Sequence, residues 1–347
     1  MTSPRNCASA IACGGLAIAI ATVTPSFAQE DPAAFYAGKQ VRIVVGIGVG
    51  SGYDLTARLV ARHIGKHIPG KPDVIVNNQP GAGSITMSNA LYASGPRDGT
   101  VIGAPFNGMP TVPLLQPDQS RFDPTKLGWV GSANRPVQAT YVWHAAPIKS
   151  MADILSREFV VGSQAPGSSQ HDYPAAANVL FGAKFKVING YEATPKIHLA
   201  MERGEVMGAG ATSWSTVKAL TGDWRKDGKI TVISQWGFRK HPDLMDVPTW
   251  SDLATTDIQK QAMKLLLARL EFGIPYFTPP EVPPARLTAL RRAFDETMKD
   301  QAFLGEAEKM KLEVDPMSGE DVQKLVAEVA ATPPEVAKLV RDAIAVK

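Results

Sequence analysis

Cysteine is almost absent from this sequence, which limits how the fold can be stabilised. Cys7 and Cys13 are the only two in 347 residues, and both lie near the start of the chain. Residues 10–23 form an apolar run after a basic residue, a signal-peptide pattern that is too short for a confident membrane span. Small residues at Ser26 and Ala28 predict cleavage after Ala28. The mature chain would then lack thiols, disulfides and thiolate metal sites, so its core alone must hold it together.

The sequence also lacks a strong excess of charge of either sign. It has 36 Lys and Arg against 33 Asp and Glu, a formal net charge of +3. A nucleic-acid-binding protein more often shows a large basic excess, so we expect no nucleic-acid partner. The length suits two ordinary domains. We place domain 1 at residues 29–125 plus 235–347 and domain 2 at residues 126–234.

What the sequence does have is a repeated order of strand, small-residue loop and helix. Residues 41–45 are a β-branched run typical of a buried strand. A loop of alternating glycines follows at residues 46–54, then a helical pattern that begins at Leu55 with Asp54 as a plausible N-cap. Two further strands are predicted, at residues 74–76 and 100–103. This βαβαβ order predicts parallel strands covered by helices, with ligands bound at the carboxyl ends of the strands.

A second unit repeats this order. Residues 129–131 and 140–143 are expected to be its first strands, and residues 159–162 the next. The small-residue loop 163–171 then leads into a helix predicted at residues 172–181. A further strand is expected at residues 205–209, and two more loops of this kind at residues 189–194 and 211–214. Two such units facing each other could close over a ligand by a hinge.

The loops do not fit a nucleotide site or a metal site. No G-x-G-x-x-G or GK[ST] motif occurs, and Asn77 stands where a ribose-binding acid would follow the second strand. His63 and His67 are four residues apart but have no HExxH pattern and no nearby carboxylate. We therefore expect no nucleotide cofactor and no metal.

Catalytic residues are not evident either. Ser168 and Ser169 lie near His171 but miss the G-x-S-x-G elbow, and no acid with a clear orienting role is identifiable. A secreted serine hydrolase that uses these three residues is nevertheless kept as the alternative function. An interaction module with a vestigial cleft is a third reading. The loops themselves offer backbone N–H groups and hydroxyls, which recognise carboxylates directly or through water.

In order along the chain, these loops resemble those of the Bug-type extracytoplasmic solute receptors, the substrate-binding components of tripartite tricarboxylate transporters. The family pattern P-x-A-G-G-G-x-D-x-x-A-R is similar to GVGSGYDLTAR at residues 48–58. The pattern V-x-N-x-P-G-A-G-G is similar to VNNQPGAGS at residues 76–84. Further similar segments lie at residues 98–102, 161–169, 189–193 and 247–252. The resemblance implies a type II periplasmic-binding-protein fold, with two α/β domains, crossover hinge strands and a ligand cleft between the domains.

The same resemblance implies a function. It indicates a periplasmic receptor, not an enzyme, that captures a small organic carboxylate (a di- or tricarboxylate or an aromatic acid) and delivers it to membrane transporter subunits. We expect a monomer without a cofactor. The expected ligand-binding residues are Gly50, Ser51, Gly52, Tyr53, Gly81, Ala82, Gly83, Phe106, Asn107, Ser163, Ser168, Ser169, Gln170, Tyr191, Thr194, Thr212, Ser213 and Trp214.

Departures from the family pattern suggest where ligand choice lies. Ser51 replaces a glycine of the first loop, and Tyr53 beside it is bulky. Thr212 or Ser213 stands where the family often has an acid, which would suit an ammonium group. The absence of that acid favours a ligand without a cationic group. Trp214 could stack on an aromatic ligand.

Overall fold

Residues 1–2 and 31–345 are described by the computed structural model. The cleavage site predicted after Ala28, both cysteines and nearly all of the predicted signal peptide lie outside these residues. Among the residues that are described, no helix combines the length and apolar character needed to cross a membrane. The export signal therefore stays a prediction from the sequence.

One sheet has six strands, in the order β11-β4-β10-β3-β1-β2. Its parallel part has β1 between β2 and β3, with Ile43 opposite Val76 on one side and Ile102 on the other. This part confirms the predicted βαβαβ order. β10 and β11 run antiparallel to β4. The bounds are β1 (Gln40–Val45), β2 (Asp73–Asn78), β3 (Val101–Ala104), β4 (Gly128–Ser132), β10 (Pro275–Thr278) and β11 (Met317–Ser318).

A second sheet has five strands, in the order β7-β6-β8-β5-β9. β6 pairs in parallel with β7 and β8, whereas β5 is antiparallel to both of its neighbours. The bounds are β5 (Gln138–Trp143), β6 (Phe159–Gly162), β7 (Phe185–Ile188), β8 (Gly208–Ser213) and β9 (Ile230–Trp236).

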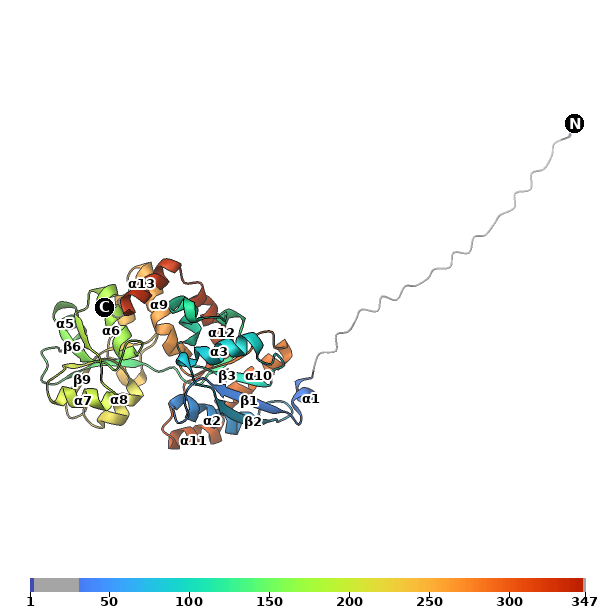
Figure 1. Cartoon of the computed structure of the whole chain (residues 1–347), viewed down its shortest axis with the longest axis horizontal. Coiled ribbons are helices and arrows are strands. Elements are labelled where there is room, and N and C mark those ends of the chain that lie inside the picture. Colours follow the sequence, from blue (N-terminus) through green and yellow to red (C-terminus); the bar gives the residue numbers. More distant parts are fainter. Residues whose placement is uncertain (3–30, 346–347) are drawn as a thin grey trace. The chain divides into compact units, whose positions relative to one another are not determined.

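Helices cover both sheets and also join them (Figure 1). The C-terminal helix α13, drawn in red, contacts α6, α9 and α4, so the end of the chain is part of the same compact unit. The first helices are α1 (Pro32–Tyr36), α2 (Gly52–Ile64), α3 (Ile85–Ser94), α4 (Val112–Leu115), α5 (Met151–Ser156), α6 (Ser169–Phe181) and α7 (Thr194–Glu202). The others are α8 (Trp214–Thr221), α9 (Asp257–Phe272), α10 (Pro284–Thr297), α11 (Gln301–Lys309), α12 (Gly319–Ala330) and α13 (Pro334–Ile344).

Three predicted elements differ from the structure. The strand predicted at 129–131 exists, but it belongs to the six-stranded sheet and not to the second unit, because Trp129 packs against Phe272 and Phe277 there. The strand predicted at 205–209 begins only at Gly208 and extends to Ser213. Helix α6 begins at Ser169, three residues before the predicted start.

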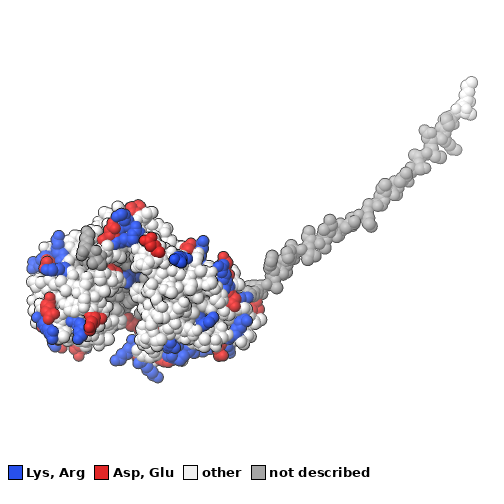
Figure 2. All heavy atoms as spheres, viewed as in Figure 1, with Lys and Arg blue, Asp and Glu red and all other residues white. Residues whose placement is uncertain are grey.

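The hydrophobic core supports this arrangement through helix α9. Leu265, Leu266, Leu267 and Leu270 of α9 are all buried, in one cluster that includes residues of both sheets. Each such leucine contributes about 1.5–3 kcal/mol relative to exposure. On the outer surface, Figure 2 shows Lys and Arg interspersed with Asp and Glu on the drawn face, in keeping with the balanced composition.

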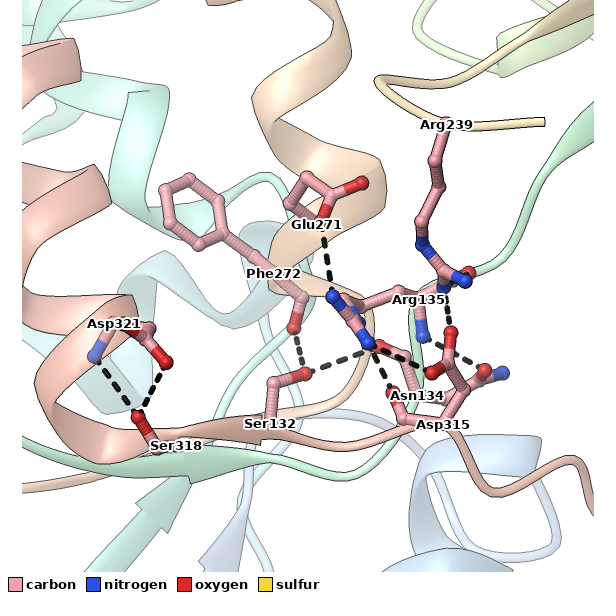
Figure 3. Close-up of polar contacts among 9 residues, drawn as sticks. All are labelled: Ser132, Asn134, Arg135, Arg239, Glu271, Phe272, Asp315, Ser318 and Asp321. Carbon is pink, nitrogen blue, oxygen red and sulfur yellow. Dashed lines mark hydrogen bonds and ion pairs between the residues drawn. The ribbon is translucent and has the colours of Figure 1, made fainter.

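The chain passes between the sheets through two segments, residues 133–137 and the stretch after β9, and an ion-pair cluster ties them together (Figure 3). Asp315 pairs with Arg135 of the first segment at 2.8 Å and also with Arg239 of the second. Glu271, at the end of α9, lies 3.8 Å from Arg135. Burial raises the pKa of Glu271, while Arg135 and Arg239 partly oppose that rise.

A close backbone approach fixes the same region. Gly273 has φ +43°, and a Cβ there would lie 1.6 Å from the carbonyl oxygen of Asn134. The Ser132 hydroxyl donates to the carbonyl of Phe272 and accepts from Ile274 N at 3.2 Å. Only glycine fits at position 273, so this crossover is sterically defined. The division into domains at residues 126 and 234 stays a proposal.

Candidate functional site

The first glycine loop is closed by a helix cap. The Ser51 hydroxyl accepts from Asp54 N at 3.2 Å, and the Asp54 carboxylate accepts from Gly50 N at 2.8 Å. Helix α2 therefore begins at Gly52, three residues before the predicted Leu55, and Ser51 rather than Asp54 is its N-cap. The prediction missed that a serine hydroxyl caps as well as a carboxylate does.

Asp54 has its own structural role beneath this loop. Its carboxylate, buried in the fold, accepts from Arg58 Nε at 3.1 Å and from Asn78 Nδ2 at 2.9 Å. Asn78 Nδ2 also donates to the carbonyl of Ile47 at 3.0 Å. Burial opposes ionisation of Asp54, but the hydrogen bonds from Arg58, Gly50 and Asn78 outweigh it and hold its pKa below the ordinary value. Asp54 thus shapes the loop and has no oxygen directed to a ligand anion.

Tyr53 joins the first loop to the end of β3. Its hydroxyl accepts from Asn107 N at 3.4 Å, and its ring centroid lies 5.7 Å from that of Phe106. Burial raises the pKa of Tyr53 to about 12, so the phenol is neutral at pH 7. Asn107 is 9% exposed, and its Oδ1 has no hydrogen-bond partner among the described residues. The structure thus brings together three of the predicted ligand-binding residues, Tyr53, Phe106 and Asn107.

The second glycine loop is strained and held against the same place. Residues 81–84 all have positive φ, including Ala82 at +44° and Ser84 at +75°. Non-glycine residues pay roughly 1–2 kcal/mol for this conformation, and such strain is concentrated at functional sites. The Ser84 hydroxyl accepts from Phe106 N at 2.8 Å, which fixes the loop to β3. Gly46 makes room, because a Cβ there would lie 2.5 Å from Ser84 Cβ.

In the second sheet, three predicted residues bond to one another. Gln170 Nε2, in the first turn of α6, donates to Thr194 Oγ1 at 3.1 Å and to Thr212 Oγ1 at 3.3 Å. Gln170 Oε1 accepts from Gln164 N at 3.3 Å. All three side chains are buried. This cluster connects the starts of α6 and α7 with the end of β8.

The serine and histidine residues of the alternative hydrolase do not form a relay in this structure. The Ser168 hydroxyl donates to the carbonyl of Ala165 at 2.6 Å and lies 3.5 Å from the hydroxyl of buried Ser163. The buried His171 ring instead contacts Asp172 through Nδ1, at 3.1 Å. Ser169 is the first residue of α6.

Trp214 is turned away from solvent, contrary to the stacking expectation. It is 4% exposed, and its Nε1 donates to Asp243 at 2.9 Å. The neighbouring Ser213 hydroxyl lies 2.9 Å from that of Ser215. Tyr191 is half-buried against the same hydrophobic cluster. The indole therefore stabilises α8 and the segment after β9, and it is not free to stack on a ligand.

A cavity of about 660 Å³ lies beside the second glycine loop. Of the predicted residues, Ala82, Gly83 and Phe106 line it. Much of the rest of its wall comes from α4, α9 and α13, from the first turns of α3 and α6, and from the segments just before α4 and α6. No pattern in the sequence indicates that these helices meet. The other lining residues are Ile85, Gly108, Met109, Thr111, Val112, Leu115, Gln116, Pro166, Gly167, Asp172, Leu265, Leu266, Arg269, Arg341, Asp342, Ile344 and Ala345.

Arg269 is the charged residue that sequence reasoning missed. Its Nη1 donates to Asp172 at 3.1 Å, its Nη2 donates to the carbonyl of Gly167 at 3.2 Å, and its guanidinium lies 5.7 Å from the Phe106 ring centroid. Its Nε is buried without a hydrogen-bond partner among the described residues. The one available signal was a single arginine inside the apolar run LLLARLEF.

His63 in α2 and His67 just after it contact carboxylates of helix α11 and its N-cap. His63 Nε2 lies 2.8 Å from Glu306, and His67 Nε2 lies 3.0 Å from Asp300. Within residues 31–345, no group of three or more His, Cys, Asp or Glu side chains could hold a metal ion. These contacts give both histidines a packing role between helices.

Comparisons with known proteins agree on one family. The sequence profile described as the tripartite tricarboxylate transporter family receptor matches residues 56–339. A UPF0065 protein from the gbd 5' region of Cupriavidus necator is 26% identical over 302 residues, which cover 82% of this chain and 84% of that protein. A TctC solute binding protein from Polaromonas has a TM-score of 0.70 at 20% identity, covering 88% of this chain and 99% of that one. A protein of R. palustris solved with adipate has a TM-score of 0.58 at 20% identity, covering 87% and 97%.

The structural likenesses confirm the predicted fold of two α/β domains as that of periplasmic binding proteins. The profile and the relatives confirm the resemblance to Bug-type receptors. Because the profile covers most of the sequence, this chain belongs to the family of tripartite tricarboxylate transporter receptors.

Proposed function

We propose that this receptor binds a small organic carboxylate in the periplasm and delivers it to the subunits of a membrane transporter. The observation that carries the proposal is the cavity of about 660 Å³ on which a strained glycine loop, Phe106, Gly167 and Arg269 converge. Ligand pockets typically have volumes of about 300–1,000 Å³ and few, well-placed polar groups. Here the polar groups include the guanidinium of Arg269, and arginine is suited to carboxylates by its geometry.

The surrounding chemistry supports binding without reaction. Ser168 is hydrogen-bonded to a carbonyl, and the His171 ring contacts Asp172, so a nucleophile and its base are not aligned. The phenol of Tyr53 has a raised pKa and stays protonated at neutral pH. A protein of R. palustris with a similar fold was solved with adipate, which is a small organic carboxylate. We propose that the receptor works as a monomer, without a cofactor and without catalysis.

Calorimetry on the purified mature protein tests this proposal. Carboxylates should bind, and each should raise the melting temperature, because a ligand at a hundred times its Kd adds about 2.7 kcal/mol of stability. Neutral amides of the same acids are the matched ligand control and should not bind. Phe106→Ala should weaken binding by about tenfold, the scale of a lost aromatic anchor.

Phe238→Ala is the matched protein control, because Phe238 is 43% exposed and does not line the cavity. It should leave binding unchanged. The proposal fails if no mono-, di-, tri- or aromatic carboxylate binds. Ester or amide turnover that disappears in Ser168→Ala would favour the hydrolase instead.

A further inference from the structure

We propose that the bound acid has one carboxylate and an apolar body, and that this body fills the cavity between α4, α9 and α13. The inference rests on the receptor function proposed above and names its substrate class. It is drawn from the lining of the cavity and from the balance of charge along its wall.

Aliphatic side chains are the largest group on the wall of the cavity. Helix α4 and the turn before it contribute Met109, Val112 and Leu115, and α9 contributes Leu265 and Leu266. Helix α13, which packs against α4 and α9, contributes Ile344, and Ala345 follows it on the wall. The cavity has a volume of about 660 Å³, which leaves room for the body of a small ligand. An apolar ligand body would gain by leaving water for it.

The charged residues on the wall balance one another. Among the described residues, Arg269 and Arg341 line the cavity together with Asp172 and Asp342, which gives a formal charge of zero. Arg269 is already paired with Asp172, and Arg341 donates to the carbonyl of Leu114. A wall of zero formal charge offers no surplus cation, so a bound carboxylate needs a hydrogen-bond donor, and burying it without one is costly. Arg269 Nε is the one buried side-chain donor on the described wall that has no partner, which provides for one carboxylate and not for two or three.

The polar end for that carboxylate lies where the two loops meet. Gly83 and Gly167 line the cavity beside Arg269, whose Nε has no partner among the described residues. The guanidinium also lies over the ring of Phe106. With its carboxylate at this end, the ligand would extend its apolar body toward α13 and contact the aliphatic part of the wall.

A series of straight-chain monocarboxylates tests the inference by calorimetry, with succinate and citrate for comparison. Each added methylene should lower the Kd by about fourfold until the cavity is full, since a buried methylene contributes about 0.8 kcal/mol. The longer monocarboxylates should bind more tightly than succinate or citrate.

A cavity-filling variant then locates the apolar body. Ile344→Trp should raise the Kd of the longer acids at least tenfold and leave acetate unchanged, because the indole occupies the space of the body but not of the carboxylate. Leu339→Trp is the matched control: Leu339 is also half-buried on α13 but does not line the cavity. Urea denaturation of both variants checks that they are folded.

The outcomes distinguish this inference from the proposed receptor function on which it rests. Tight binding of apolar acids, lost in Ile344→Trp and kept in Leu339→Trp, would support the inference. If succinate or citrate binds most tightly, or if Ile344→Trp binds the longer acids normally, the inference is overturned while the carboxylate receptor stands. If no acid of either kind binds, both are overturned.

Discussion

Replacing Arg269 by methionine should destabilise the folded protein, because the change leaves Asp172 buried without its cation. The Asp172 side chain is 3% exposed and lies 3.1 Å from Arg269 Nη1. Its remaining partners are Gly167 N at 2.9 Å and the His171 ring at 3.1 Å. Breaking a buried ion pair from one side typically costs about 3–5 kcal/mol, and we expect Arg269→Met to fall in this range.

The double variant shows whether the cost comes from the unpaired charge. Asp172→Asn keeps an oxygen that can accept from Gly167 N, so alone it should cost about 1–3 kcal/mol. In Arg269→Met/Asp172→Asn no buried charge is left unpaired. The double variant should therefore be more stable than the sum of the single changes predicts, by about 0.5–3 kcal/mol of coupling.

Urea denaturation followed by tryptophan fluorescence measures these values, with an unchanged m-value as the sign that stability alone has changed. Arg292→Met is the matched control, since Arg292 and Glu296 form an exposed pair at 3.7 Å that should contribute only about 0–1 kcal/mol. The reasoning is refuted if Arg269→Met costs no more than Arg292→Met, or if the two single changes at the buried pair are additive.

Three further changes have defined outcomes. Gly273→Ala places a Cβ against a backbone oxygen of the first crossover and should lower the free energy of unfolding by more than about 4 kcal/mol. The control Gly305→Ala lies in open space within α11 and should raise the free energy of unfolding by about 0.5–1 kcal/mol. Thermal unfolding would distinguish the two variants. The lowered pKa of Asp54 gives stability at neutral pH that is lost as the pH falls through that pKa. Asp54→Asn should therefore be less stable than wild type at pH 7 and approach it in acid. Glu271 affects stability in the opposite direction, because burial raises its pKa and its ionised form therefore destabilises the fold at neutral pH. Glu271→Gln should be more stable than wild type at pH 7, and equal stabilities at pH 7 would contradict this. The advantage should vanish below about pH 4, where the unfolded glutamate is protonated as well.

Much of the local structure could be predicted from the sequence. The β-branched run at residues 41–45 is β1 apart from one residue, and the small-residue loops do precede helices. These features depend on neighbours within about four positions, so a linear pattern carries them. The errors were also local: Ser51 caps α2 in place of Asp54, and α6 starts at Ser169. In both cases a serine at the end of a loop begins the helix earlier than the apolar pattern indicates.

Only a small part of the candidate site could be predicted from the sequence. Ala82, Gly83 and Phe106 were expected, and they line the cavity. Trp214 was expected to stack on a ligand but is buried against the segment that holds Asp243. Its environment depends on a residue 29 positions away, which no local pattern reveals.

By itself, the sequence determined the family, the two α/β units and the small-residue loops between strands and helices, because short motifs and the order of strand, loop and helix are local features of the chain. Only the tertiary structure decided that β4 belongs to the six-stranded sheet and that Arg269 pairs with Asp172, 97 positions away. It also decided that α4, α9 and α13 enclose an aliphatic cavity. The reason is physical: such contacts follow from the order in which strands join a sheet and from where the crossovers direct the helices. A linear sequence pattern does not specify that order.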